Sequence, residues 1–187
     1  RRFRVTSIFI TQCKMPVLLE LFSGTGSVGR GFQARGWEVI SIDVDPTTAC
    51  TICMDVRDLT PAQLPTRPDF IWASPVCCHY SRARTKAKTP RNLEWADSLV
   101  SAVLRLSQEL GVPTFFENPS SGLLKTRQIV RGIPYREVDY CKYFDHRSTH
   151  AARKRTAIWQ IGAEWVPARS LCKKDCGHCT DGRHDET

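Results

Sequence analysis

The sequence predicts an α/β protein with a Rossmann-like, mostly parallel sheet and an antiparallel last strand. Three observations support this fold class: short apolar runs alternate with helical patterns, a glycine-containing turn follows the first run, and polar residues follow the ends of several runs. Strands that alternate with helices form a layered sheet with crossover connections, and such sheets bind ligands at the carboxyl ends of their strands. We therefore expect a ligand site where these polar residues gather.

The expected elements follow one another from residue 16 to residue 162. Apolar runs predict strands at 16–22, 37–43, 51–56, 69–75 and 113–119 and an antiparallel pair at 135–143 and 155–162. A short helix is expected from 27 to 35. A longer helix is expected over 92–110, because its apolar residues recur at helical spacing; Asn92 is its expected N-cap and Gly111 its stop.

Composition and charge restrict the class of protein. A chain of 187 residues is long enough to bury one core. Its net charge of +8 favours a polyanionic partner, and no apolar run approaches the roughly 18 residues that a membrane span needs. Nine cysteines, an odd number in varied contexts, favour a reducing compartment, either cytoplasmic or nuclear, in which thiols serve chemistry, packing or metal binding.

The first three expected strand ends predict a site for an adenosine cofactor. Gly24 and Gly26 follow the first strand and allow backbone N–H groups to approach a ligand. Asp43 ends the second strand, where an acid can hold both hydroxyls of a ribose, and Asp55 after the third could meet an adenine amino group. No Lys-Ser/Thr pair follows these glycines, which argues against a P-loop.

The next two strand ends predict a reactive thiol and a carboxyl group. Cys77 lies just past the fourth strand behind Pro75, and Glu117 ends the fifth. A lone cysteine is more often a packed thiol, but basic residues follow this one and are expected to favour the thiolate. With Arg153 and Arg155 before the last strand, this set predicts attack on an electron-poor ring, followed by group transfer.

Five segments, in order, resemble motifs of the cytosine-5 DNA methyltransferase family, and most closely its compact phage and virus members. They are "LLELFSGTGSVGRGF", "IDVDP", "ASPVCCHYS", "ENP" and "RKRTAIW", and the resemblance covers about residues 17–184. It implies a virus- or phage-encoded, S-adenosylmethionine-dependent enzyme acting on DNA. The implied cofactor residues are Phe22, Ser23, Gly24, Thr25, Gly26, Asp43, Val44, Asp55, Val56 and Pro75.

The resemblance also implies roles for the reactive groups. Cys77 would attack C6 of cytosine, while Glu117 holds N3 and the 4-amino group. C5 then takes the methyl group, its proton is removed and Cys77 leaves. Arg155, with Arg153, would hold the O2 side of the base. Cys78 falls where the family has another polar residue and is taken as a bystander.

A basic loop follows the thiol and is expected to contact the DNA backbone. The target base must leave the duplex, and the 79–91 loop would clamp the phosphates while it does so. The loop's cations are Arg82, Arg84, Lys86, Lys88 and Arg91.

The chain departs from the family pattern at several points. Val76 replaces the commoner second proline, Ala151 stands where many members have Gln, and the 144–152 loop is long. The large target-recognition region and the C-terminal cofactor motif have no counterpart here, so weak sequence specificity is expected. An RNA cytosine-5 methyltransferase remains an alternative, as does a catalytically idle SAM-fold module that binds nucleic acid.

The remaining segments are the two ends of the chain. Residues 1–14 contain no acid and are expected to form a disordered N-terminal extension, ahead of a methyltransferase domain over 15–164 and a Cys/His-rich tail over 165–187. The tail's "CGHC" also matches a redox motif, and unliganded cysteines are the ordinary alternative. The spacing C-x3-C-x2-C-x4-H suits a structural zinc ion. Its expected ligands are Cys172, Cys176, Cys179 and His184.

Overall fold

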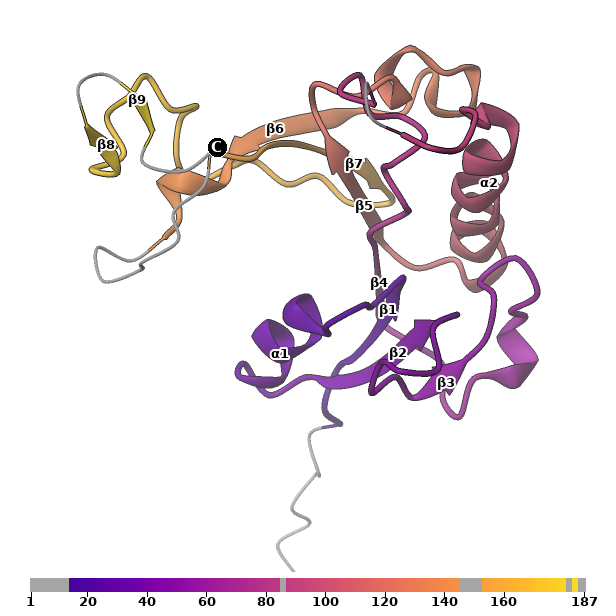
Figure 1. The fold of residues 1–187 in the computed structure, drawn as a ribbon. Coiled ribbons are helices and arrows are strands. Elements are labelled where there is room, and N and C mark those ends of the chain that lie inside the picture. Colours follow the sequence, from indigo (N-terminus) through magenta and orange to yellow (C-terminus); the bar gives the residue numbers. More distant parts are fainter. Residues whose placement is uncertain (1–13, 85–86, 145–152, 181–182, 185–187) are drawn as a thin grey trace, which may run out of the picture.

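A computed structural model describes residues 14–84, 87–144, 153–180 and 183–184, and its centre is a seven-stranded sheet with the order β3-β2-β1-β4-β5-β7-β6 (Figure 1). The strands are β1 (Val17–Leu21), β2 (Glu38–Asp43), β3 (Ile52–Cys53), β4 (Phe70–Ala73), β5 (Thr114–Pro119), β6 (Tyr135–Asp139) and β7 (Arg155–Ile161). β1 to β5 pair in parallel, whereas β7 runs antiparallel to both β5 and β6. The predicted fold class is confirmed, including the antiparallel last strand.

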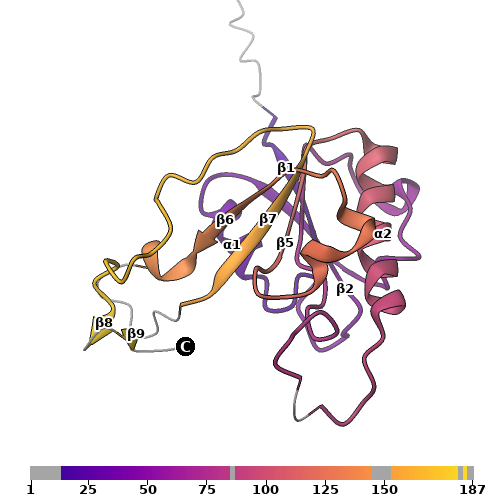
Figure 2. The same cartoon turned by 90° about the horizontal axis from the view of Figure 1, so that it is seen from above.

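Two α-helices cover opposite faces of this sheet, α1 (Ser27–Gln33) and α2 (Leu93–Leu110) (Figures 1 and 2). The ends of α2 are those predicted: the Asn92 side chain accepts the Trp95 N–H at 2.9 Å, and Gly111 has a left-handed φ of 63°. Four short 3-10 helices complete the elements: η1 (Pro61–Gln63), η2 (Leu124–Thr126), η3 (Gln128–Val130) and η4 (Tyr140–Lys142). Among the described residues, no helix is long and apolar enough to cross a membrane.

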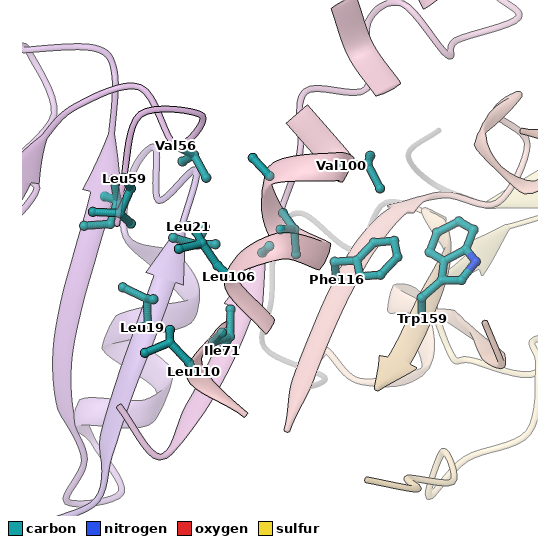
Figure 3. Packing of buried hydrophobic residues seen from close by; sticks show 14 of the residues in the cluster. Leu19, Leu21, Val56, Leu59, Ile71, Val100, Leu106, Leu110, Phe116 and Trp159 are labelled. Atoms are coloured by element: carbon teal, nitrogen blue, oxygen red, sulfur yellow. The ribbon is translucent and has the colours of Figure 1, made fainter. Parts of the chain in front are cut away.

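The main core lies between α2 and the sheet. Figure 3 shows Leu19, Leu21 and Ile71 of the central strands near Leu106 and Leu110 of α2, and the side chains of all five are buried. Farther along the sheet, Phe116 of β5 stacks on Trp159 of β7 with the ring centroids 5.2 Å apart. Burial of these apolar side chains fixes the carboxyl ends of β1, β4 and β5 next to one another.

The other face of β1 requires a glycine in α1. Glu20 alternates with the core residues of β1; burial raises the pKa of its carboxyl group, and the backbone N–H groups of Gly29 and Val28 at the start of α1 partly oppose this change. A Cβ atom on Gly29 would lie 2.4 Å from Oε2 of Glu20, so no side chain fits there without a shift. This contact sets the distance between the helix and the strand and thereby the position of the glycine turn that joins them.

Several element boundaries differ from those predicted. The third strand, predicted over 51–56, is only Ile52–Cys53 in the structure. The strand predicted over 135–143 ends at Asp139, and η4 begins at the next residue. The tail forms a small hairpin of β8 (Cys179–Thr180) and β9 (Arg183–His184), which lies beyond the end of β6 (Figure 1). The expected extension over 1–14 falls, apart from Lys14, outside the described residues, as does Ala151. The proposed domain boundaries stay predictions.

Candidate active site

A cavity of about 200 Å³ opens at the carboxyl ends of the first four strands, where the adenosine cofactor was predicted. Its lining includes predicted cofactor residues, namely Phe22, Asp43, Val44, Asp55 and Val56. The rest of the lining is Met54, Ser74, Val76, Trp95 and Leu99. Trp95, in the first turn of α2, both packs against the core and borders the cavity.

The glycine turn is fixed to the end of β2 by a carboxylate. Asp43 accepts the Gly24 N–H at 2.7 Å with one oxygen and the Asp45 N–H at 2.9 Å with the other. Phe22 adopts a left-handed φ of 58°, which few non-glycine residues do and which marks a constrained position. The turn is therefore preorganised, and the Asp43 oxygens keep lone pairs that could accept further donors from a ligand.

Asp55 is held by its neighbour Arg57. The guanidinium donates to both carboxylate oxygens, with the shortest contact at 2.6 Å, and this hydrogen bonding lowers the pKa of Asp55. The Arg57 guanidinium also lies 5.9 Å from the centre of the Trp95 ring. The second acid of the predicted site is thus an ionised acceptor at the edge of the cavity.

The remaining predicted cofactor residues lie elsewhere. A second cavity, of about 220 Å³, lies against α1 and is lined in part by Ser23, Gly24, Thr25 and Gly26. Pro75 is buried beneath the turn that follows β4. The predicted cofactor set is therefore divided between two cavities on either side of the glycine turn, and only the first also borders the thiol loop.

Cys77 and Glu117 lie at adjacent strand ends, and the charge of Glu117 reaches the thiol. The Asn118 side chain donates to the Pro75 carbonyl at 2.9 Å, and this buried bond ties the turn before Cys77 to the end of β5. The thiol and the carboxyl group are close enough for the charge of Glu117 to raise the pKa of Cys77. The structure thus assembles the predicted thiol and carboxyl group at one site.

The cation of this site is Lys154, which the sequence reasoning missed. Its ammonium lies 3.5 Å from Oε1 of Glu117 and 5.4 Å from the centre of the Tyr140 ring. The side chain of Glu117 is only 13% exposed, and its Oε2 has no hydrogen-bond partner among the described residues. Burial raises the pKa of Glu117, and Lys154 opposes that change. Lys154 lies between two arginines that match the family motif, and this position was the one available signal.

The expectation that basic residues favour the Cys77 thiolate is wrong for the free protein. Desolvation raises the pKa of the thiol, and the nearby charge of Lys154 only partly counteracts it. Two of the loop arginines, Arg84 and Arg91, bind backbone carbonyl groups of the loop instead. The thiol of the free protein therefore ionises less readily than that of an ordinary cysteine.

Arg155 and Arg153 face a different carboxylate. Arg155 makes two hydrogen bonds to Asp139 at 2.9 and 2.8 Å, and Nε of Arg153 lies 3.9 Å from the same group. The side chain of Asp139 is fully buried. Their predicted contact with the base stays a prediction, and it would require at least one guanidinium to turn away from Asp139.

Two of the predicted DNA-binding cations donate hydrogen bonds to backbone carbonyl groups of the loop that contains them. Arg84 donates to the carbonyl oxygens of Cys78 and Thr89, and Arg91 donates to those of His79 and Ser81. Such bonds shape the loop next to the thiol and leave less of these two guanidinium groups for phosphates.

Of the other loop cations, Arg82 and Lys88 make no such bonds to described residues. The side chains of Arg82 and Lys88 are exposed, whereas Lys86 lies outside the described residues. The loop is also fixed to α2, because His79 accepts the Asn92 N–H at 2.9 Å through Nδ1. This bond makes His79 part of the loop's support.

The Cys/His cluster of the tail differs from the predicted set by one residue. Cys172, Cys176 and His184 come together as predicted, but the fourth member is Cys141 of η4. The sulfur of Cys179 lies 3.6 Å from that of Cys176, outside this group. The cause is a hydrogen bond of 2.8 Å from the Cys172 N–H to Asp139, which holds the tail against the segment that carries Cys141.

Sequence comparison finds methyltransferases. No family model matches the chain. The chain is 29% identical over 174 residues to the "Probable DNA (cytosine-5)-methyltransferase" of Frog virus 3 (isolate Goorha), covering 85% of this chain and 77% of that protein. It is 27% identical over 124 residues to "Type II methyltransferase M.AplI" of Arthrospira platensis, covering 63% of this chain but only 35% of that protein.

Structure comparison agrees at the level of the fold. The S. pombe Dnmt2 methyltransferase superposes with a TM-score of 0.50 at 14% identity, covering 86% of this chain and 58% of that one. Together with the strand order, this similarity establishes a methyltransferase fold. The relatives confirm that this chain resembles the cytosine-5 DNA methyltransferase family, as its motifs indicate.

Proposed function

We propose that this protein transfers a methyl group from S-adenosylmethionine to C5 of cytosine in DNA. The observation that carries the proposal is the grouping of Cys77, Glu117 and Lys154 at the ends of adjacent strands, beside a cavity with two acids. A thiol and a buried carboxyl group suit addition to a pyrimidine ring, in which one atom is attacked while another accepts a proton. The net charge of +8 supports a polyanionic substrate.

The residues of the first cavity fit the adenosine part of the cofactor. Phe22, Val56 and Trp95 offer apolar and aromatic surface for a purine ring, and the Asp43 carboxylate could accept ribose hydroxyl groups. Asp55 lies where an exocyclic amino group would need an acceptor. The bound cofactor would supply the methyl group, and the protein would hold it next to the thiol loop.

The proposed chemistry uses both sides of the pyrimidine ring. The Cys77 thiolate adds to C6, forming a C–S bond, while the C5–C6 double bond shifts its electrons toward C5. Glu117, whose pKa is raised by burial, donates a proton toward N3 and accepts a hydrogen bond from the 4-amino group. C5 would take the methyl group through a new C–C bond, and the broken sulfur–methyl bond would leave the cofactor as a neutral thioether. C5 then loses its proton to a base, the electron pair reforms the C5–C6 double bond, the thiolate leaves and the N3 proton returns to Glu117.

Glu117 is suited to this role because its pKa is raised. A buried carboxyl group with an unpartnered oxygen holds its proton more readily than an exposed one and can donate it to a ring nitrogen. Lys154 limits this effect and keeps the group able to ionise. The same ammonium favours the thiolate of Cys77, so one cation adjusts both reacting groups.

The direct test is the product. Protein, S-adenosylmethionine and cytosine-containing DNA are incubated, the DNA is digested and its nucleosides are identified by mass spectrometry; a matched RNA is treated in parallel. We expect 5-methylcytosine in the DNA, its loss by more than about 1,000-fold in Cys77→Ser, and near-normal yield in Cys78→Ser. Product only in the RNA would favour the RNA alternative, and no product in either would favour an idle binding module.

A further inference from the structure

We propose that Cys141, Cys172, Cys176 and His184 form a structural zinc site that joins the C-terminal tail to the end of β6. Their candidate ligand atoms all lie within 4.8 Å of one another. Nε2 of His184 is 3.5 Å from the sulfur of Cys141 and 3.4 Å from that of Cys172. Three members belong to the tail, and one belongs to the segment that follows β6.

These separations match the geometry of a tetrahedral zinc ion. Zinc binds thiolate sulfur at about 2.3 Å and imidazole nitrogen at about 2.0–2.1 Å, so tetrahedral angles place a sulfur and a nitrogen ligand about 3.6 Å apart. The two sulfur–nitrogen distances here are close to that value. Three thiolates and one imidazole form a known closed structural set, and soft sulfur ligands select zinc over magnesium or calcium.

Burial of the thiols supports a metal over unliganded cysteines. Cys141 is 1% exposed and Cys172 is 6% exposed, yet the polar residues Lys173, Lys174 and Asp175 directly follow Cys172. A segment with so many polar residues has little apolar surface to bury and gains its stability from other bonds. A metal bound by four side chains would supply that stability.

A disulfide is the competing use of these sulfurs. The bond needs a sulfur–sulfur distance of about 2.05 Å, whereas the sulfurs of Cys176 and Cys179 are 3.6 Å apart. Cys179 also competes as a ligand, since the sequence spacing favours it. The grouping of Cys141 with the other three side chains is the observation that decides between the two cysteines.

The site is connected to the catalytic segment by a buried carboxylate. Asp139 accepts the Cys172 N–H and the guanidinium of Arg155, and Arg155 directly follows Lys154, the partner of Glu117. An ion pair of 3.0 Å between Lys142 and Asp175 adds a second link across the same junction. Zinc would therefore fix the tail where it supports the segment that carries Lys154.

Metal analysis with two matched variants tests the ligand set. The full-length protein is purified without added metal, and zinc is measured per chain in wild type, Cys141→Ser and Cys179→Ser. We expect about one zinc in wild type and in Cys179→Ser, and less than a tenth of an equivalent in Cys141→Ser. Less than half an equivalent in wild type, or loss in Cys179→Ser with retention in Cys141→Ser, would overturn the proposal.

Cobalt binding gives a second readout that needs no variant. Chelator-treated wild-type protein is titrated with Co²⁺ under reducing conditions, and the visible and near-ultraviolet spectra are recorded. We expect saturation at one equivalent, with the strong visible bands of a tetrahedral site and sulfur-to-cobalt charge-transfer absorption, both removed by added Zn²⁺. Weak octahedral bands without charge transfer would overturn the site. Neither experiment depends on methyl transfer, so the proposed function can fail while the zinc site stands.

Discussion

Two regions of this molecule use cysteine in opposite ways. Just past the end of β4, Cys77 is an exposed residue whose thiol is affected by one ammonium group, that of Lys154, and one carboxyl group, that of Glu117. Beyond the end of β6, Cys141 and Cys172 are buried beside another thiol and an imidazole. An exposed thiol near one cation can react with a substrate, whereas several buried thiols around a histidine suit a metal.

The chemistry of each thiol depends more on the groups that lie near it in space than on the residues next to it in the sequence. Adjacent basic residues after Cys77 predicted a thiolate, but those arginines bind loop carbonyl groups, and the effective cation comes from a distant segment. In the tail, the local spacing predicted Cys179, but Cys141, which follows β6, occupies the fourth position of the cluster. Both corrections come from the region around β6 and β7.

The largest expected effect concerns the carboxylate that joins the two regions. Asp139→Asn would leave Arg155 without its charged partner and weaken the bond to the Cys172 N–H. Breaking a pair that contains a fully buried carboxylate costs about 3–5 kcal/mol, so we expect the melting temperature to fall by about 6–20 °C. Differential scanning calorimetry measures the melting temperature. Glu137→Gln, on the same strand and with a more exposed ion pair, is the control and should cost under about 1 kcal/mol.

Equal losses in Asp139→Asn and Glu137→Gln would mean that Asp139 has no special linking role. A separate measurement of zinc content in Asp139→Asn sharpens the result. If the tail depends on this carboxylate, its zinc content falls together with its stability.

The second prediction concerns the cofactor side of the thiol region. Asp43→Asn should weaken S-adenosylmethionine binding by about 1.5–3 kcal/mol, because a charge-assisted hydrogen bond to a ribose hydroxyl becomes a neutral one. Titration calorimetry measures the affinity. Asp45→Asn is the neighbouring control, since that side chain only closes its own turn with Thr47. Unchanged affinity in Asp43→Asn would remove Asp43 from the proposed site.

The third prediction concerns the pH dependence of the thiol site. The pKa of Cys77 is raised, so methyl transfer should increase with pH until the thiol ionises. Lys154→Met removes the charge that lowers this pKa, so the rising limb should move to higher pH and the activity at pH 7 should fall. Lys173→Met, on the exposed tail, should leave the profile unchanged. An acidic shift in Lys154→Met would contradict the assignment of Lys154.

The smallest expected effect concerns the basic loop. The double variant Arg82→Ala/Lys88→Ala should weaken binding to unrelated DNA sequences and reduce the salt slope by about one to two units, because exposed cations release counterions from phosphates. Fluorescence anisotropy at several salt concentrations measures this slope. Arg84→Ala should instead loosen the loop through its lost carbonyl contacts. A slope unchanged in the double variant, with affinity lost on one sequence only, would indicate base readout.

The sequence predicted the fold well because its signals are local. Each strand of the parallel half is an apolar run, and the residues that follow it define the strand end. Cys77, Glu117 and Asp43 could be found in this way. The N-cap Asn92 and the stop Gly111 were equally visible, since caps depend on neighbouring residues.

The missed residues depend on contacts between distant segments. Lys154 was passed over for the arginines on either side of it, which pair with Asp139 in the structure. Cys141 lay inside a predicted strand, but β6 ends two residues earlier and η4 turns the thiol toward the tail. No spacing rule within one segment could have indicated either contact.

The central claim is that Cys77 forms a covalent bond to the target base, and trapping tests it most directly. A DNA containing 5-fluorocytosine cannot release the C5 substituent as a proton, so the adduct would accumulate in the presence of S-adenosylmethionine. We predict a denaturant-stable complex whose peptide map places the nucleotide on Cys77 and leaves Cys78 unmodified. A cross-link on Cys78, or no cross-link under conditions in which the protein binds both DNA and cofactor, would contradict the account.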